Sequence, residues 1–498
     1  MSSNPQSLIP NFAWRRLLGL LGILLLGVAA GAAVAWGKPA IAIAAVVAGV
    51  IGVALLQHVQ WAVWALAAVL TLLPFGALPL GIGFNPTLLN LAFVLMLAAW
   101  LMVVVGHGEF GWRTTPLWLP TLVYGALAVF AFLLGSENAL LTRDLLRRFV
   151  EFLLTLSLVW LLPTVLRSYA DVINATRALV LSGGVAAALG LGLWALPDAT
   201  ETRLLSLLRV FDYPTGERIL RYINDDPSLP QRATSTSVDP NAFGGLLIIV
   251  AALTIPNLFA RRPILPRWLA WGLVSVMGLA LFATRSRGSM LGLLAAAAFL
   301  ALLRYRRLAL WLVVAVALAL VLPWTQEYVA SFFAGARGQD LSTQMRLGEY
   351  KDAINLIGRH PLFGVGYAAT PDIDLYIGVS SMYLLLAENM GLVGLAAFAA
   401  VALVFFWTAR AGLRTGDLDL EPVILGGAAA IFGVLVAGAL DHYFVNIKFP
   451  ASVTLFWFVV SLTATVATLA VRQRAEAAAE SPAFAARPAP APPAPAPR

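Results

Sequence analysis

Apolar runs of about 20 residues recur along most of this chain of 498 residues, and they constrain its fold more than any other feature. A helix needs a run of that length to cross the hydrocarbon core of a bilayer. No segment shows the strict alternation of a membrane β-barrel strand, and 60% of the residues are hydrophobic while 12% are charged. We therefore predict an all-α fold, a polytopic transmembrane helical bundle of about 12–14 spans.

The distribution of arginines indicates how the bundle is oriented, because cytoplasmic loops are enriched in Lys and Arg. With the N-terminus in the cytoplasm, successive inner loops carry Arg15/Arg16, Arg113, Arg167/Arg177, Arg261/Arg262/Arg267, Arg304/Arg306/Arg307, Arg410/Arg414 and Arg472/Arg474. This alternation places both termini of the multi-pass chain in the cytoplasm. The outer loops nevertheless hold many basic residues: Arg143/Arg147/Arg148, Arg203/Arg209/Arg218/Arg221/Arg232, Arg285/Arg287 and Arg337/Arg346/Lys351/Arg359.

The excess of positive charge in the outer loops indicates an anionic ligand. A guanidinium group binds two oxygens of a phosphate at once, whereas an uncompensated cation close to a membrane is costly. The alternative is that individual arginines pair with acids such as Asp212 or Glu349, or anchor lipid headgroups.

Two outer loops, 197–240 and 324–378, are the segments long enough to hold a site outside the membrane. In the second loop, apolar residues recur at helical spacing over Thr343 to Arg359 and predict an amphipathic helix along the bilayer surface. Such a helix is suited to close as a lid over a membrane-borne substrate. We expect residues 1–474 to form one transmembrane domain and the Ala/Pro-rich residues 475–498 to be a disordered cytoplasmic tail.

The chain lacks the residue patterns of a metal centre. It has no cysteine, and the histidines are scattered without the spacing of a metal site: His58, His107, His360 and His442. We therefore expect no metal and no cofactor. We find no nucleotide-binding loop and expect no nucleic-acid partner.

Three short patterns lie at the outer ends of predicted spans. The first runs over 232–243 from Arg232 to an Asp-Pro-Asn helix start, and the second is Thr-Arg-Ser-Arg-Gly-Ser over 284–289. The third combines Arg346 with Arg-His-Pro-Leu-Phe-Gly-Val-Gly over 359–366 and continues, after a loop, at Tyr383. In it, Gly364 and Gly366 permit a tight turn after the expected lid helix.

In order, spacing and position, these patterns resemble the O-antigen ligase and polymerase superfamily, over roughly 230–470. These bacterial enzymes transfer glycans from undecaprenyl diphosphate on the periplasmic face of the inner membrane. The resemblance implies a GT-C-like, inverting, metal-independent glycosyltransferase with a periplasmic active site. By position, Arg232 and Arg287 would bind the donor diphosphate, and Arg346 is a third candidate. For Arg285 we favour an ion pair or a headgroup contact.

The chain departs from the family pattern at the start of the last motif. The ligases carry a His-Asn pair ahead of the Tyr-Leu step, and that histidine is their proposed general base, whereas Ser380 and Ser381 stand here. A serine hydroxyl is not a useful base near neutral pH. The candidate replacements are Asp372, Asp374, Glu388, Asp239, Asp441 and His442. We expect Asp239 to cap the helix that begins at Pro240, and His360 to hold the turn that follows the lid helix.

The function we favour is polymerisation of undecaprenyl-diphosphate-linked repeat units, as in O-antigen or exopolysaccharide synthesis, because the histidine of the ligases is missing. Ligation of the glycan to lipid A-core or to a protein is the alternative. A transporter or flippase for a lipid-linked or anionic solute is a further alternative, although such proteins show two pseudo-equivalent halves. The expected partners are the lipid-linked donor, an acceptor glycan or lipid A-core, the bilayer and, for a polymerase, a chain-length regulator.

Overall fold

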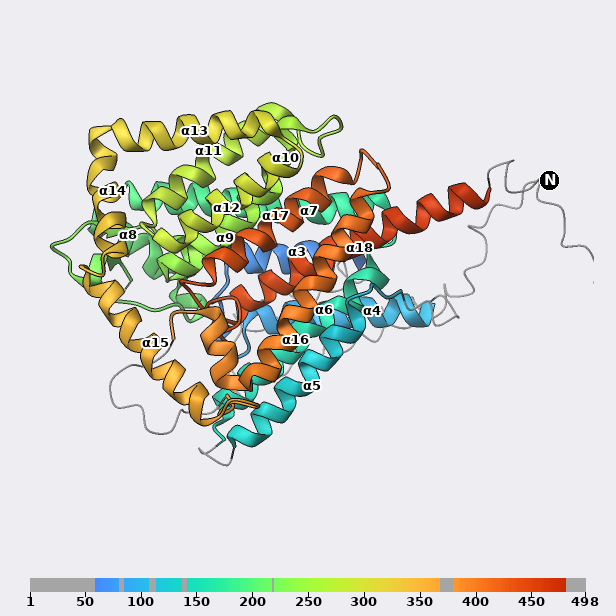
Figure 1. Ribbon diagram of the computed structural model, residues 1–498, viewed down its shortest axis with the longest axis horizontal. Coiled ribbons are helices and arrows are strands. Elements are labelled where there is room, and N and C mark those ends of the chain that lie inside the picture. Colours follow the sequence, from blue (N-terminus) through green and yellow to red (C-terminus); the bar gives the residue numbers. More distant parts are fainter. Residues whose placement is uncertain are drawn as a thin grey trace, which may run out of the picture.

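A computed structural model describes residues 59–79, 85–106, 113–136, 141–216, 219–367 and 379–480, and these form a bundle of helices (Figure 1). Within these ranges, five helices are long and apolar enough to cross a membrane: Trp118–Gly135, Tyr169–Trp194, Pro240–Phe259, Met382–Leu413 and Pro450–Ala479. This confirms the predicted all-α, polytopic bundle. The spans expected before residue 59, the candidate Asp374 and the tail from residue 481 lie outside the described residues.

The first half of the described chain consists of long apolar helices: α3 (Val59–Leu72), α4 (Leu88–Gly106), α5 (Trp118–Gly135), α6 (Arg143–Val165) and α7 (Tyr169–Trp194). Sequence signals fix where they begin. Ser168 and Asp171 form a capping box at the start of α7, and the Thr142 hydroxyl accepts from the backbone N–H of Leu145 at the start of α6.

The loop expected over 197–240 holds short elements: α8 (Asp198–Ser206), η2 (Leu207–Phe211), β1 (Arg221–Tyr222), η3 (Ile223–Asp225), β2 (Gln231–Arg232) and η4 (Ser235–Ser237). The strands pair antiparallel, with Arg221 opposite Arg232. This small hairpin delivers Arg232 to the start of the next membrane helix.

The second half carries the helices that surround the candidate site: α9 (Pro240–Thr254), α10 (Pro256–Phe259), α11 (Arg267–Ala283), α12 (Arg287–Leu303), α13 (Arg306–Val321), α14 (Pro323–Ala336), α15 (Leu341–Arg359), α16 (Met382–Leu413), α17 (Glu421–Ala437) and α18 (Pro450–Ala479). Helices α9, α12 and α17 pack together in the core. At the contact of α12 with α17, a Cβ on Gly292 or Gly433 would collide with the other glycine's carbonyl oxygen. Small residues allow this close approach.

The loops gather at two ends of the bundle. At one end, here called the lid end, the turn before α12 meets the start of α15, and the start of α16 meets the end of α17. Helices α13, α14 and α15 follow one another along the edge of the bundle toward this end (Figure 1). At the other end, here called the arginine end, Arg262 pairs with Asp419 and Arg304 with Glu421.

The lid helix expected over Thr343–Arg359 is α15, which begins two residues earlier because the Asp340 carboxylate caps it. The turn after it packs against α16 where Gly391 (φ 69°) kinks that helix. The Val365 N–H donates to Glu388 O at 2.8 Å, and a Cβ on Gly364 (φ 68°) would collide with the same oxygen. Glycine is therefore required here for close backbone approach.

At the C-terminal side, α18 continues to Ala479, five residues past the domain boundary expected at 474.

Candidate functional site

Arg232 lies at the centre of the lid end and is surrounded by neutral partners. Its Nε donates to Thr284 O at 2.9 Å, and its Nη2 donates to Asn241 Oδ1 at 2.6 Å. Burial lowers the pKa of the Arg232 guanidinium, and the charges of Asp239 and Asp441 act in the opposite direction. The side chain is thus a desolvated cation without a direct carboxylate partner among the residues that the structure describes.

The start of α9 holds these partners in place. The Asp239 carboxylate accepts from the backbone N–H groups of Asn241 and Ala242, both at 2.8 Å, which is the N-cap expected from the Asp-Pro-Asn sequence. Asn241 is thereby fixed with its Oδ1 toward Arg232. Tyr443, in the loop between α17 and α18, lies 3.5 Å from the Asn241 amide nitrogen.

The Asp441–His442 pair lies in the same loop, against the start of α16. The Met382 N–H donates to Asp441 O at 2.9 Å, so this pair adjoins Ser380 and Ser381. Burial raises the pKa of the Asp441 carboxyl to about 7, an effect that Asp239 adds to and that Arg346 and Arg232 oppose. Burial lowers the pKa of His442 to about 4, and its Nδ1 is buried without a hydrogen-bond partner among the described residues.

Helix α15 carries Arg346 to this pair. The Arg346 charge acts on both Asp441 and His442, and the Arg346 side chain forms no hydrogen bond or ion pair with another described residue. Neighbouring side chains attach the helix: Glu349 accepts from the Ser380 N–H at 2.8 Å, and the Tyr350 hydroxyl lies 3.1 Å from the carbonyl oxygens of Ser380 and Ala439. Helix α15 therefore places the charge of Arg346 near Asp441 and His442.

Arg287, the first residue of α12, is already engaged. Its guanidinium forms an ion pair with Asp340 and donates from Nη2 to Ser342 Oγ at 3.0 Å, both at the start of α15. Gly335 of α14 packs so closely that a Cβ there would collide with the Arg287 Nη1. The ion pair thus joins the turn before α12 to the lid.

Tyr328 of α14 shows that the arginines of the first two motifs lie together. Burial raises the pKa of its hydroxyl, and the charges of Arg287, Arg232 and Arg285 all act on it in the opposite direction. Arg285 has a left-handed backbone (φ 52°), and its backbone N–H donates to Phe282 O at 3.1 Å. Its side chain forms no hydrogen bond or ion pair with a described residue, and a headgroup contact stays the prediction for this arginine. Strain of this kind clusters at functional sites.

The remaining predicted residues have structural contacts. His360 ends α15, and its carbonyl accepts from the Gly364 N–H at 3.1 Å, so its backbone holds the turn. Gly366 is packed so closely on Gly135 that a Cβ would collide there. Ser381 is buried next to Met382, and the Tyr383 hydroxyl donates to Leu435 O of α17 at 2.6 Å.

The described residues contain no group of three or more His, Cys, Asp or Glu side chains that is arranged to hold a metal ion. The lid end instead combines a desolvated arginine, further arginines and a carboxyl group with a raised pKa. Such an arrangement is able to bind an oxyanion and to accept a proton from a hydroxyl next to it.

Asp340 and Ser342 were not predicted from the sequence to be partners of Arg287. Tyr328 was likewise not predicted to lie near three arginines. A capping signal marks Asp340, since it stands three residues before Thr343. No signal in the sequence indicates its ion pair with Arg287, which depends on how the lid lies.

Comparison with known proteins bears on the segment that supplies most of this site. No curated protein matches the chain in sequence. Residues 272–399, from α11 to α16, match the model of a protein family described as O-antigen ligase. This match supports the resemblance of the segment to the O-antigen ligase and polymerase superfamily.

Proposed function

We propose that this protein is a metal-independent, inverting glycosyltransferase that polymerises undecaprenyl-diphosphate-linked glycan units at the periplasmic face of the inner membrane. The observation that carries the proposal is the meeting of Arg232 and Arg346 with Asp441 at the lid end. The match of residues 272–399 to the O-antigen ligase family supports a lipid-linked glycan as the substrate class.

In this proposal Arg232 binds the diphosphate of the donor. Its bonds to Thr284 O and Asn241 Oδ1 fix the guanidinium without neutralising it. The leaving lipid diphosphate gains negative charge in the transition state, and a preorganised cation in a site of low dielectric constant stabilises that charge. Arg346 is a second candidate from α15, because its charge acts on the same Asp441 carboxyl as that of Arg232, whereas Arg287 is available only after it leaves Asp340.

Asp441 is the proposed general base. A carboxyl group with a pKa of about 7 is partly ionised at neutral pH and is a stronger base than an ordinary aspartate. The His442 imidazole, with a pKa of about 4, is neutral there but much less basic. Because Asp441 adjoins Ser381 through Met382, it supplies a base beside the position where the ligases carry their histidine.

The reaction follows from these positions. An acceptor sugar hydroxyl attacks the anomeric carbon of the donor while its proton passes to Asp441. The bond between that carbon and the diphosphate oxygen breaks, and undecaprenyl diphosphate leaves with both bonding electrons. Attack from the face opposite the leaving group inverts the configuration at the anomeric carbon.

Ligation of the glycan to lipid A-core is the second candidate, and the description of the matched family favours it. The two candidates differ in their acceptor. The experiment is to incubate the purified full chain with lipid-linked repeat units, with or without lipid A-core, and to separate the products by size. A ladder from repeat units alone supports polymerisation, and product only with lipid A-core supports ligation. No glycan product under either condition would contradict the proposed enzyme.

A further inference from the structure

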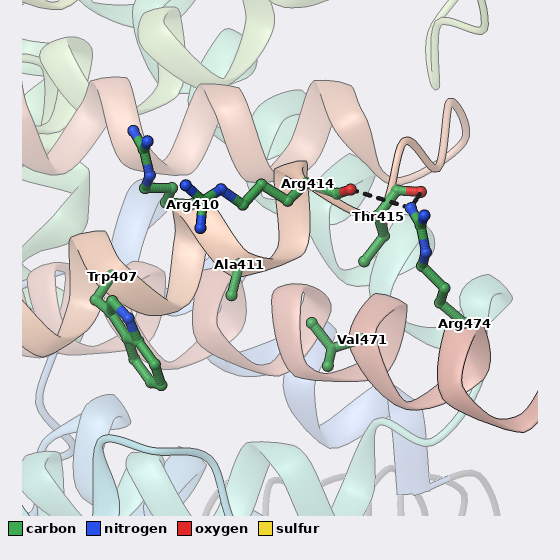
Figure 2. A pocket seen from close by; sticks show the side chains of 7 residues that line it. All are labelled: Trp407, Arg410, Ala411, Arg414, Thr415, Val471 and Arg474. Atoms are coloured by element: carbon green, nitrogen blue, oxygen red, sulfur yellow. Dashed lines mark hydrogen bonds between the residues drawn. The ribbon is translucent and has the colours of Figure 1, made fainter. Parts of the chain in front are cut away.

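A groove at the arginine end lies between the last turns of α16 and the C-terminal part of α18 (Figure 2). Its volume is about 380 Å³, and it is lined mainly by Trp407, Arg410 and Arg414 of α16 together with Val471 and Arg474 of α18. Helix α16 starts at the lid end and, after its kink at Gly391, runs 22 residues to Leu413, which at about 1.5 Å per residue is about the thickness of a bilayer core.

The groove carries positive charge that nearby acids do not compensate. Arg474 donates to the carbonyl oxygens of Arg414, at 3.0 Å, and Thr415, and thereby caps the end of α16 (Figure 2). Arg410 and Arg414 are exposed, lie one helical turn apart, and form no side-chain hydrogen bond or ion pair with a described residue.

Three acids between the end of α16 and the first residue of α17 are engaged elsewhere. Asp417 accepts from the Tyr169 hydroxyl, Asp419 pairs with Arg262 at 2.9 Å, and Glu421 pairs with Arg304 at 2.8 Å. Two like charges one turn apart repel each other, so an anion that binds both guanidinium groups relieves the repulsion.

An apolar strip continues from these arginines toward the middle of the bundle. Trp407 lies one turn before Arg410 and is 63% exposed, and Leu403 one turn further is 72% exposed. Tryptophan is typical of the level at which lipid headgroups meet acyl chains. Along α16, the two cationic arginines are thus followed by the Trp407 indole and then by the aliphatic Leu403. This order matches a ligand that has an anionic head and an apolar tail.

We propose that this groove binds an anionic phospholipid, with its phosphate between Arg410 and Arg414 and an acyl chain along Trp407 and Leu403. Basic pockets between membrane helices recognise anionic headgroups in this way. The site lies in the leaflet opposite the candidate active site and does not depend on the proposed reaction. Arg474 supports it by holding the end of α16.

The experiment measures lipid binding to the full-length protein in detergent by native mass spectrometry, with dioleoylphosphatidylglycerol as the probe and dioleoylphosphatidylcholine as the zwitterionic comparison. Replacing Arg410 and Arg414 together by Gln is expected to weaken phosphatidylglycerol binding about 30-fold, since each arginine contributes about 1 kcal/mol and 1.4 kcal/mol is a factor of ten. The Arg410→Lys/Arg414→Lys variant keeps the charge and is expected to keep most of the affinity.

The matched control replaces Arg306 and Arg307 by Gln, because these two exposed arginines lie at the same end outside the groove and their side chains form no hydrogen bond or ion pair with a described residue. This control removes the same charge and is expected to bind phosphatidylglycerol as the unchanged protein does. Equal losses in both double variants would overturn the proposal in favour of general attraction to positive charge. Unchanged binding in the groove variant, equal binding of phosphatidylcholine, or complete competition by inorganic phosphate would also overturn it.

Discussion

Arg232 and Arg287 are both arginines at the lid end, and both act on Tyr328, yet their direct partners differ. Arg232 donates only to neutral oxygens, those of Thr284 and Asn241, whereas Arg287 pairs with the Asp340 carboxylate. Arg232 therefore keeps its charge for a ligand, while the charge of Arg287 is balanced as long as α15 stays in place. We therefore expect Arg232 to bind an anion while α15 stays in place, and Arg287 to bind one only after its ion pair with Asp340 is broken.

The difference lies in the elements that supply the partners. The partners of Arg232 come from the turn before α12 and the first turn of α9, both in the rigid bundle. The partners of Arg287, Asp340 and Ser342, come from the first turn of the lid helix. In the proposed function, a donor diphosphate would bind Arg232 directly but would have to displace the Asp340 carboxylate from Arg287, which would couple donor binding to the position of α15.

The largest effect is expected from Arg232→Ala. Because removing one preorganised donor from an oxyanion site lowers kcat about 10²–10³-fold, transfer should fall by that factor. Steady-state kinetics with a lipid-linked repeat unit measures it. Arg232→Lys is the matched variant, since it keeps the charge and loses the planar fork, and it should recover part of the rate. Full activity of Arg232→Ala would show that Arg232 does not take part in the reaction.

The pH profile should distinguish the two arginines. Asp441 accepts a proton only when it is ionised, so the rate should fall about tenfold per pH unit below its pKa of about 7 and level off above it. Arg232 lowers the pKa of Asp441, so Arg232→Ala should move the falling, acidic part of the pH–rate profile (its acidic limb) to higher pH. The charge of Arg287 is balanced by its ion pair with Asp340, so Arg287→Ala should move the acidic limb of the pH profile less than Arg232→Ala does. A limb that moves equally in both variants would contradict the comparison.

Arg287→Ala should lower the rate less, by about 20- to 200-fold. Removing Arg287 also removes the need to break its ion pair with Asp340, and a partly exposed pair of this kind stabilises by up to about 1 kcal/mol, or about fivefold. The same kinetic assay compares the two alanine variants. A loss of rate in Arg287→Ala that equals or exceeds the loss of rate in Arg232→Ala would contradict the expected difference between the two arginines.

Several features of this site were predictable from the sequence because they depend on neighbours along the chain. The Asp239 cap follows from its place before Pro240, and the lid helix follows from apolar spacing over Thr343–Arg359. The ion pair between Arg287 and Asp340 was not predictable, because it joins residues that only the placement of α15 brings together. The kink of α16 at Gly391 likewise depends on how closely the turn after α15 packs against it.

The smallest effect is expected from Asp340→Asn. This change removes the carboxylate from Arg287 but keeps the N-cap of α15, because Asn caps helices about as well as Asp. Undecaprenyl diphosphate should then bind about two- to fivefold more tightly, which equilibrium binding measures. Asp340→Ala also removes the cap and separates the two roles. Weaker binding of undecaprenyl diphosphate to Asp340→Asn would show that the ion pair between Arg287 and Asp340 stabilises the site and does not keep Arg287 from the ligand.

The most direct test of the proposed site is the release of undecaprenyl diphosphate from a synthetic lipid-linked repeat unit by the purified protein in EDTA. The structure predicts release coupled to glycan product in the unchanged protein. In Asp441→Asn, release should be at least about 100-fold slower and should not rise between pH 6 and 8. Equal release by both proteins would contradict the assignment of Asp441, and release by neither would contradict glycan transfer at the lid end.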